Sequence, residues 1–464
     1  MVGAGGQPMP TRRHLIASAL ALVGARATPA AALGLDATTL GLVPGSEADQ
    51  GPALAAALEE ATTRGLALHL PAGQFRLSPV ALPDGAVITG VGGRTELIAA
   101  GDAPEILTAE DCHSVHLSGL TFLGAGGKSD APAGLVSLET CASASLCDCT
   151  FRAAPAQGVS LWRSAANITG CRFSGCFGAA IGAREALGGD FSGNAISDCA
   201  NLGIYVEETG ATAESGPDRG PVGLTIRGNR ISRIASAMGG DGQNGNGINL
   251  YNTEGAVVNG NVVADCAFSA IRLNATRNIV VTANTGLRSG EVALFCEFGF
   301  SGSVLSDNVI DGAAAGIALT NLDDGGRLAT CTGNVVRAIT PTSATNPDTR
   351  LYGIFAEADV ALSANVIDSV PGPGLLLGWG PYGRNLSAIG NVVTDCDIAI
   401  AVSVVEGVGT VLVRDNVISG ARRALAGMEW EEVRLPDLAA AVRAGEVESV
   451  PGLVLDGNVI AAPG

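Results

Sequence analysis

The sequence predicts an all-β fold, a right-handed parallel β-helix, and three repeating features carry this prediction. The first is a short pattern in which a small residue precedes alternating apolar and variable residues, as at 203–207 and 247–251. This alternation is typical of a β-strand with two side chains buried and two exposed. The second is a period of 22–23 residues between strand openings, such as Gly247, Ala270 and Ala293. That period suits three short strands and three turns per coil of a single-stranded β-solenoid.

The third feature is an asparagine that recurs once per coil, after a small or acidic residue and before an apolar pair. Its positions are Asn194, Asn229, Asn261, Asn308, Asn334, Asn365, Asn391, Asn416 and Asn458, while Asn284 fits the pattern less well. Asparagine tolerates left-handed backbone, and its side chain bonds to its own turn. Stacked one per coil, these side chains are expected to form a buried amide ladder, so we interpret them as structural residues.

The amino terminus has the features of an export signal. Residues 11–16 resemble the twin-arginine motif, with leucine where phenylalanine is usual and Ala17 where lysine is frequent. An apolar run at 15–23 and small residues at 29–32 complete a cleavable signal. A membrane anchor is the alternative, but the run is shorter than the ~20 apolar residues that span a bilayer. We therefore predict a twin-arginine signal peptide at 1–32, no membrane anchor after its cleavage, and a periplasmic or secreted protein.

The rest of the chain divides into three predicted parts. An N-terminal cap with the first coils is expected at 33–114, with a linker at 33–45; a regular parallel β-helix at 115–420; and a C-terminal cap at 421–464. Both ends need a cap because an uncovered coil would expose sheet edges.

Each cap is expected to contain a helix. In the N-terminal cap the helix is predicted at 46–64, with Leu54, Leu58 and Ala61 on one side and Ser46 or Asp49 as its cap. In the C-terminal cap a short helix is expected at 436–445, followed by a last strand at 452–460.

Charge limits the classes of partner. The chain carries 27 basic and 45 acidic residues, a net charge of −18; without residues 1–32 the counts are 24 and 45, a net charge of −21. This surplus of carboxylates repels phosphate backbones and anionic lipid surfaces, so we expect no nucleic-acid partner. It also disfavours a polyanionic sugar unless arginines gather at the site.

The eleven cysteines would ordinarily indicate disulfides in an exported protein. Their positions in the repeat indicate a different role. Four precede a strand opening by three or four residues, namely Cys176, Cys199, Cys266 and Cys396, and two take the asparagine position, namely Cys149 and Cys171. We favour buried thiols that act as small apolar fillers; one or two disulfides between stacked pairs, or a metal, are the alternatives.

Coils longer than the period show where loops leave the solenoid. The extra material lies at 208–221, 237–247, 321–327, 340–350 and 378–384. All of these segments flank the repeated strand, so we expect them to wall one side of the solenoid. Long loops beside a regular scaffold are where function usually resides.

Two columns of side chains on the repeated strand are expected to face outward. Their central members are Tyr205, Asn249, Arg272 and Phe295 in the first column and Glu207, Tyr251, Asn274 and Glu297 in the second. Because neighbouring strands lie about 4.8 Å apart, these side chains should form one patch. Aromatic faces, amides and carboxylates suit a sugar, so we predict a groove that binds a polysaccharide, with Asp241 beside it. A decorated solvent face, stabilised by cross-strand pairs, is the alternative.

If the protein is an enzyme, the sequence indicates a polysaccharide lyase or a glycoside hydrolase, with Arg272, Glu297 and Glu207 as the catalytic candidates. A β-elimination lyase needs a base near the C5 proton, and Arg272 with its acidic neighbours resembles such a site. An inverting glycosidase needs carboxylates about 6.5–9.5 Å apart. Glu207 and Glu297 lie three strands, about 14 Å, apart, so a loop acid such as Asp241 would have to complete a pair.

No metal site is predicted. Cys112, His113 and His116 lie close together in the sequence. On a strand, however, residues 113 and 116 point to opposite faces, so they do not converge on one ion.

The signal, the short cap and the 23-residue repeats together resemble the twin-arginine-translocated β-helix repeat proteins of bacteria, within the pectate-lyase-like superfamily. That family is largely uncharacterised, and its repeat is thought to bind a cofactor because of the export route, so the resemblance implies a cofactor of unknown identity. None of the superfamily's catalytic motifs matches. Three hypotheses follow: an exported carbohydrate-binding or carbohydrate-active β-helix with a groove centred on Arg272, a non-catalytic surface scaffold, and a carrier of that cofactor.

Overall fold

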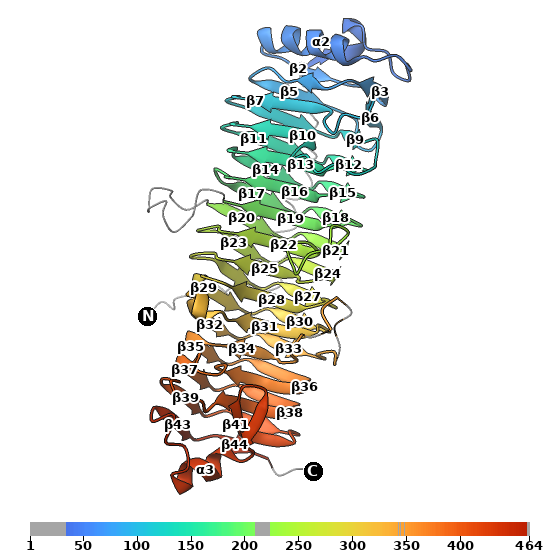
Figure 1. Ribbon diagram of the computed structural model, residues 1–464. Coiled ribbons are helices and arrows are strands. Elements are labelled where there is room, and N and C mark those ends of the chain that lie inside the picture. Colours follow the sequence, from blue (N-terminus) through green and yellow to red (C-terminus); the bar gives the residue numbers. More distant parts are fainter. Residues whose placement is uncertain (1–33, 209–222, 342, 344, 348, 462–464) are drawn as a thin grey trace, which may run out of the picture.

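The chain forms a single elongated parallel β-helix, which confirms the predicted fold class. The computed structural model describes residues 34–208, 223–341, 343, 345–347 and 349–461. Figure 1 shows the stacked coils with helix α2 (Gly51–Thr63) at one end and helix α3 (Leu438–Ala444) at the other. The predicted signal peptide and nearly all of the loop at 208–221 lie outside the described residues.

One face of the solenoid is a sheet of 16 described strands, which we call the first ladder. Its strands, in spatial order, are β1 (Gly34–Asp36), β2 (Ala67–His69), β5 (Ala86–Thr89), β8 (Val115–Ser118), β11 (Ala144–Cys147), β14 (Ala166–Thr169), β17 (Gly189–Ser192), β20 (Leu224–Arg227), β23 (Val257–Asn259), β26 (Val280–Thr282), β29 (Ser301–Ser306), β32 (Arg327–Thr332), β35 (Ala358–Ser363), β37 (Arg384–Ile389), β39 (Val411–Arg414) and β43 (Leu453–Asp456).

The other described strands form two ladders that share β36 (Val366–Leu377) and β38 (Val392–Ser403). The second ladder also contains β3 (Gly73–Leu77), β6 (Thr95–Ala99), β9 (Thr121–Leu123), β12 (Thr150–Arg152), β15 (Arg172–Ser174), β18 (Ala195–Ser197), β21 (Arg230–Ile234), β24 (Val262–Cys266), β27 (Thr285–Leu287), β30 (Val309–Asp311), β33 (Val335–Arg337), β40 (Val417–Ser419) and β44 (Val459–Ile460).

The third ladder carries the repeated strand of the sequence. It contains β4 (Val80–Ala81), β7 (Leu107–Glu110), β10 (Gly134–Glu139), β13 (Gln157–Trp162), β16 (Ala179–Arg184), β19 (Leu202–Glu207), β22 (Asn246–Tyr251), β25 (Ile271–Asn274), β28 (Val292–Glu297), β31 (Ala315–Leu319), β34 (Ile354–Ala356) and β41 (Arg423–Glu429). Its last strand pairs antiparallel with β42 (Glu432–Leu435), which makes a hairpin at the carboxy-terminal end.

The interior is filled by side chains stacked in register along the axis. The rings of Phe122, Phe151 and Phe173 stack face to face, with centroids 4.9 and 4.7 Å apart. All eleven cysteines are free thiols, and all but the half-buried Cys147 are buried, as expected for small apolar fillers.

The asparagines form the predicted buried ladder, and Asn284 belongs to it. The backbone N–H and the Nδ2 of Asn284 both donate to Oδ1 of Asn308, at 3.0 and 3.1 Å. Asn308 donates in the same way to Asn334, and its Nδ2 also bonds to the carbonyl of Val281. The ladder begins at Cys171, whose N–H donates to Asn194, so this cysteine does occupy the asparagine position.

The amino-terminal cap differs from the prediction in two respects. Helix α2 begins at Gly51 rather than at residue 46, because Oδ1 of Asp49 accepts the N–H groups of Gly51 and Ser78 and so holds Asp49 outside the helix. The predicted linker at 33–45 is also wrong. Its first residues form β1, which pairs with β2, and a 3₁₀ turn, η2 (Ala37–Leu40), follows.

The short helix and the last strand predicted at the carboxy-terminal end are both present. Helix α3 is capped by Asp437 and ends at Gly445, and β43 and β44 follow it. Among the described residues, no helix is both long enough and apolar enough to cross a membrane.

Candidate functional site

The outward columns of the third ladder have the predicted register. Tyr205 pairs with Asn249, Asn249 with Arg272, and Arg272 with Phe295 on successive strands. In the second column, Glu207, Tyr251, Asn274 and Glu297 pair in the same order. Side chains that are 23 to 44 residues apart in the sequence are therefore neighbours on one surface.

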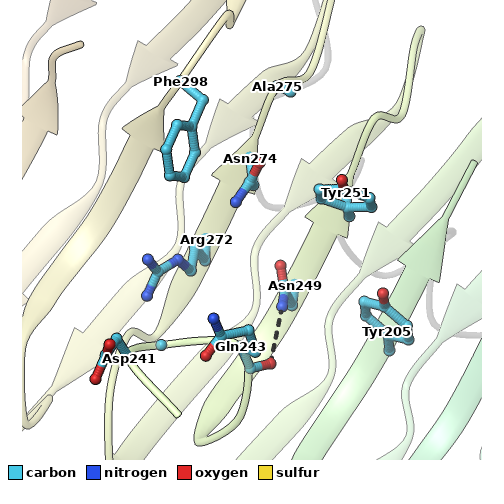
Figure 2. A pocket seen from close by; sticks show the side chains of 10 residues that line it. Tyr205, Asp241, Gln243, Asn249, Tyr251, Arg272, Asn274, Ala275 and Phe298 are labelled. Carbon is cyan, nitrogen blue, oxygen red and sulfur yellow. Dashed lines mark hydrogen bonds between the residues drawn. The ribbon is translucent and has the colours of Figure 1, made fainter. Parts of the chain in front are cut away.

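These columns contribute to a cavity of about 610 Å³, which we call the tyrosine pocket (Figure 2). It is lined by Tyr205, Asp241, Gly242, Gln243, Asn249, Tyr251, Arg272, Asn274, Ala275 and Phe298. Six of the nine predicted site residues are in this lining. Figure 2 shows the rings of Tyr205 and Tyr251 on neighbouring strands, with Asp241 and Gln243 on the opposite side.

The loop before β22 closes that opposite side. Nδ2 of Asn246 donates to the carbonyl of Gly242 at 2.7 Å, and Nδ2 of Asn249 donates to the carbonyl of Gln243 at 3.4 Å. Gly242 has φ +102° and lies against the guanidinium of Arg272, where a Cβ would collide with Nη1. Glycine is therefore required at this position for the loop to pack onto the strand.

Arg272 is buried in a cluster with two carboxylates. Its Nε and Nη2 donate to the two oxygens of Glu297 at 2.5 and 2.7 Å, and its Nη1 donates to Glu291 at 3.3 Å. Nδ2 of Asn274 donates to the same Oε1 of Glu297 at 2.9 Å, and the guanidinium lies over the ring of Phe295. Burial raises the pKa of Glu291, and the nearby Arg272 charge opposes this shift.

Three predicted residues lie outside the tyrosine pocket. Glu207 forms an ion pair with Arg184 at 3.0 Å, and Glu297 is buried behind Arg272. Phe295 lines a second cavity farther along the ladder. The catalytic roles of Arg272, Glu297 and Glu207 stay predictions, but the chemistry of the cluster favours positioning, because Arg272 uses three donors to hold carboxylates.

The second cavity has a volume of about 410 Å³, and we call it the tryptophan pocket. It is lined by Glu291, Val292, Phe295, Thr320, Asn321, Asp323, Asn346, Thr349, Arg350, Tyr352, Phe355, Glu357, Trp379, Tyr382 and Trp430. Arg272 lines the first pocket and Glu291 the second, so this ion pair separates two adjoining sites on one face.

Loops from several coils build the tryptophan pocket. The segments 321–327, 340–350 and 378–384 each contribute lining residues, as does Trp430 from the turn between β41 and β42. For these three predicted outgrowths, the arrangement confirms that they wall one side of the solenoid. Gly380, at φ +53°, lies beneath the Trp430 ring, whose nearest carbon would be 2.3 Å from an added Cβ.

Aromatic rings meet edge to face along one wall of this pocket. Phe355 contacts Tyr352 and Trp379, with centroids 5.3 and 6.4 Å apart, and Trp379 contacts Trp430 at 5.7 Å. The guanidinium of Arg350 lies over the Trp379 ring, 3.9 Å from its centroid, and Arg350 also pairs with Glu431 at 3.0 Å.

Glu357 is the buried acid of the tryptophan pocket. Its side chain accepts the N–H of Leu322 at 2.7 Å, at the start of the 3₁₀ turn η3 (Leu322–Asp324). Burial raises its pKa to about 7; backbone hydrogen bonds partly oppose this rise, and the charge of Asp323 adds to it. A perturbed carboxyl in a cavity is a common sign of a functional site.

The sequence-based prediction missed this pocket, although a compositional signal was present. The chain has only four tyrosines and three tryptophans. All four tyrosines and two of the tryptophans line the two pockets. Scarce aromatic residues at 352, 379, 382 and 430 were therefore the clue to a second site.

The described residues contain no group of three or more His, Cys, Asp or Glu side chains that could hold a metal ion. Cys112 is buried and its Sγ contacts backbone carbonyls of Leu82 and Glu110. His116 is in β8, where it pairs with Val87 and Ser145.

Comparison with known proteins identifies the fold. Residues 157–336 match the family model described as a right handed beta helix region. Similar solved structures include a mutant tailspike protein of E. coli bacteriophage HK620 in complex with a pentasaccharide, with 12% identity, TM-score 0.53, and coverage of 85% of this chain and 78% of that chain. The Dettilon tailspike protein has 13% identity, TM-score 0.47, and coverage of 82% and 68%.

A further similar structure is the A-module of the Azotobacter vinelandii mannuronan C-5 epimerase, with 14% identity, TM-score 0.34, and coverage of 92% of this chain and all 100% of that chain. No protein with a curated description matches this chain. The resemblance to twin-arginine-translocated repeat proteins, and the cofactor it implies, stay predictions. What the comparisons establish is that this chain shares the right-handed parallel β-helix with tailspike-like proteins.

Proposed function

We propose that this chain binds a polysaccharide along the outer face of the third ladder, with the tyrosine pocket as a saccharide site. The observation that carries the proposal is the composition of the lining. Two tyrosine rings and Phe298 offer flat apolar faces, while Gln243, Asn249 and Asn274 offer amide donors and acceptors. Saccharide rings present an apolar face and a rim of hydroxyls, so this lining matches both.

Two details support an uncharged or weakly charged ligand in the tyrosine pocket. The guanidinium of Arg272 is neutralised by Glu297 and Glu291, so it offers little charge to a polyanion. Oδ1 of Asn249 is buried and has no hydrogen-bond partner in the described part of the chain. A hydroxyl that donates to this oxygen would remove the penalty of a buried unpaired acceptor.

The HK620 tailspike was solved with a pentasaccharide on the same type of fold. That likeness extends to the fold, so the argument for this chain rests on its own pocket. Processing of the bound sugar by a lyase or hydrolase mechanism is a finer proposal, and it would draw its acid from the face that carries Glu207, Glu297 and Glu357.

Tyr251→Ala tests the binding proposal, because Tyr251 is 38% exposed and has no role in the core. Affinity for a neutral polysaccharide, identified with a panel in glycan-array or gel-retardation assays, should fall about tenfold, the equivalent of about 1.4 kcal/mol. Trp162→Ala is the matched control, since Trp162 is in the same column three strands away and outside both pockets. Binding that is absent across the panel, or unchanged by Tyr251→Ala, would contradict the proposal.

We also propose that the protein works outside the cytoplasm, after export through the twin-arginine route. The motif at 11–16 supports this proposal. Replacing Arg12 and Arg13 together by lysine should abolish export, measured as the fraction of protein in the periplasm or medium, whereas Arg26→Lys should leave export intact. Undiminished export of the double variant would exclude this route.

A further inference from the structure

The tryptophan pocket contains a buried carboxyl that lacks a basic partner. Glu357 is only 6% exposed. Among the described residues, no arginine, lysine or histidine forms an ion pair with it, and its hydrogen bond comes from a backbone N–H. A buried carboxylate is stable when a positive charge lies beside it. The pocket therefore has a place for a cation next to Glu357.

The neighbours of Glu357 favour a positive ligand over a negative one. Asp323 and Glu291 also line the pocket, and Asp323 raises the pKa of Glu357. Arg350 is the one basic residue of the described lining, and it is paired with Glu431; its charge lowers the pKa of Glu357 less than burial raises it. Tyr352 and Tyr382 complete the set of titratable groups in the lining.

The ring wall of the pocket already binds a cation. Arg350 lies over Trp379 at a distance typical of a cation–π contact. Trp430 meets Trp379 edge to face and is 43% exposed, so its ring is available to a ligand. Ring faces and carboxylates together form the kind of cage that holds ammonium groups.

We infer that the tryptophan pocket binds the protonated amine of an amino sugar, held between Glu357 with Asp323 and the exposed ring of Trp430. This inference rests on the proposed function, because it assigns a preferred sugar class to the face that binds the polysaccharide. The two pockets adjoin at the Arg272–Glu291 ion pair, so one oligosaccharide can place neutral units in the tyrosine pocket and an unacetylated hexosamine in the tryptophan pocket. The net charge of −18 attracts a polycation to this surface.

The probes are three β-1,4-linked tetramers that differ only at nitrogen: glucosamine, N-acetylglucosamine and N,N,N-trimethylglucosamine. Affinity is measured by calorimetry from pH 5.5 to 8.5, and the trimethylated tetramer keeps its charge over this whole range. The wild-type protein should bind the trimethylated tetramer at least tenfold more tightly at pH 8.5 than at pH 5.5, because Glu357 becomes ionised. At pH 7 the glucosamine tetramer should bind at least tenfold more tightly than the acetylated one.

Three variants separate the inference from the proposed function. Glu357→Gln should remove the preference for the charged tetramers and flatten the pH profile. Trp430→Ala should weaken the binding of the two charged tetramers, and Tyr251→Ala should weaken the binding of all three tetramers. Glu110→Gln, an exposed acid on the same ladder, is the control. Circular dichroism verifies that each variant is folded.

The outcomes are distinct. Equal affinity for charged and acetylated tetramers, or a pH profile that survives Glu357→Gln, would overturn the inference and leave the proposed function standing. Binding of the charged tetramers that depends on Glu357 but not on Tyr251 would support the amine site and contradict the tyrosine pocket. Failure of all three tetramers to bind the wild-type protein would overturn the inference.

Discussion

Arg272 lines the proposed ligand-binding surface, but its main role is to stabilise a buried ion cluster. It is 7% exposed and holds Glu297 and Glu291, which are themselves buried. Removing one member of a buried ion cluster leaves the others charged and unpaired, which is more damaging than the loss of the contact itself. Arg272 therefore fixes the wall between the two pockets.

We expect Arg272→Ala to lower the free energy of unfolding by about 3–5 kcal/mol, measured by denaturant titration. Arg277→Ala is the matched control, because Arg277 pairs with Glu254 at the surface and such pairs contribute about 0–1 kcal/mol. Equal losses of unfolding free energy in the two variants would show that the buried cluster contributes no more to stability than a surface ion pair.

Glu357 makes stability depend on pH in a predictable direction. Its pKa is 4.5 in an unfolded chain and about 7 in the folded protein, because burial penalises the carboxylate. The contribution of Glu357 to the free energy of unfolding is most favourable below pH 4.5. It falls as the pH rises from 4.5 to 7 and is constant above pH 7. Glu357→Gln removes this dependence, so the variant should gain up to about 3 kcal/mol relative to wild type between pH 4.5 and 8.

The measurement is the difference in unfolding free energy between wild type and Glu357→Gln at several pH values, because other titrating groups cancel in that difference. Glu110→Gln, which removes an exposed carboxyl of the same ladder, is the control. A flat difference for Glu357→Gln would mean that Glu357 is ionised in the folded protein well below pH 7.

At the scale of the element, the asparagine ladder is the most regular feature of the solenoid. Each interior member, such as Asn308, both accepts from the previous coil and donates to the next, so one substitution breaks bonds in three coils. The repeated asparagine in the sequence predicted this ladder, because a residue that recurs at the period of the coil must stack on itself.

We expect Asn308→Ala to lower the unfolding free energy by about 2–4 kcal/mol, because it leaves the N–H of Asn284 buried without an acceptor and removes the side-chain bonds of Asn308 to two other coils. Asn458→Ala is the control at the end of the ladder, where the side chain is half-buried and accepts only from Asn416. Denaturant midpoints measure both. A smaller loss at Asn308 than at Asn458 would contradict the role assigned to the ladder.

Local signals predicted the elements less well where tertiary contacts decide their ends. The apolar spacing of Leu54, Leu58 and Ala61 correctly indicated a helix and its buried side. The start of that helix depends on Asp49, which is held by the N–H of Ser78 from a later coil. No pattern within the segment itself contains that contact.

At the scale of the whole molecule, the period determined the fold and half of the site. Once the register was known, Tyr205, Asn249, Tyr251 and Arg272 had to lie together, and the tyrosine pocket confirms it. The tryptophan pocket could not be obtained in this way. Its loops do not repeat, and Trp430 reaches it from a hairpin that follows the regular coils.

The interior as a whole predicts an unusual thiol behaviour. Burial raises the pKa of Cys331, Cys266 and Cys396 to about 12, so these thiols stay protonated at ordinary pH. In a native sample purified without reductant, only Cys147 should react readily with a thiol reagent. After unfolding, all eleven cysteines should react. Fewer than eleven reactive thiols after unfolding would indicate disulfides between stacked pairs.

The hairpin of β41 and β42 also has a consequence for how such a chain can change during evolution. A solenoid lengthens by duplication of a coil, and an extra coil between β10 and β16 would leave both pockets as they are. An extra coil between β36 and β38 would move the hairpin about 4.8 Å along the axis and separate Trp430 from Trp379, which follows β36. The number of coils can therefore change in the first half of the molecule without altering the pockets, whereas the hairpin constrains it near the carboxy-terminal end.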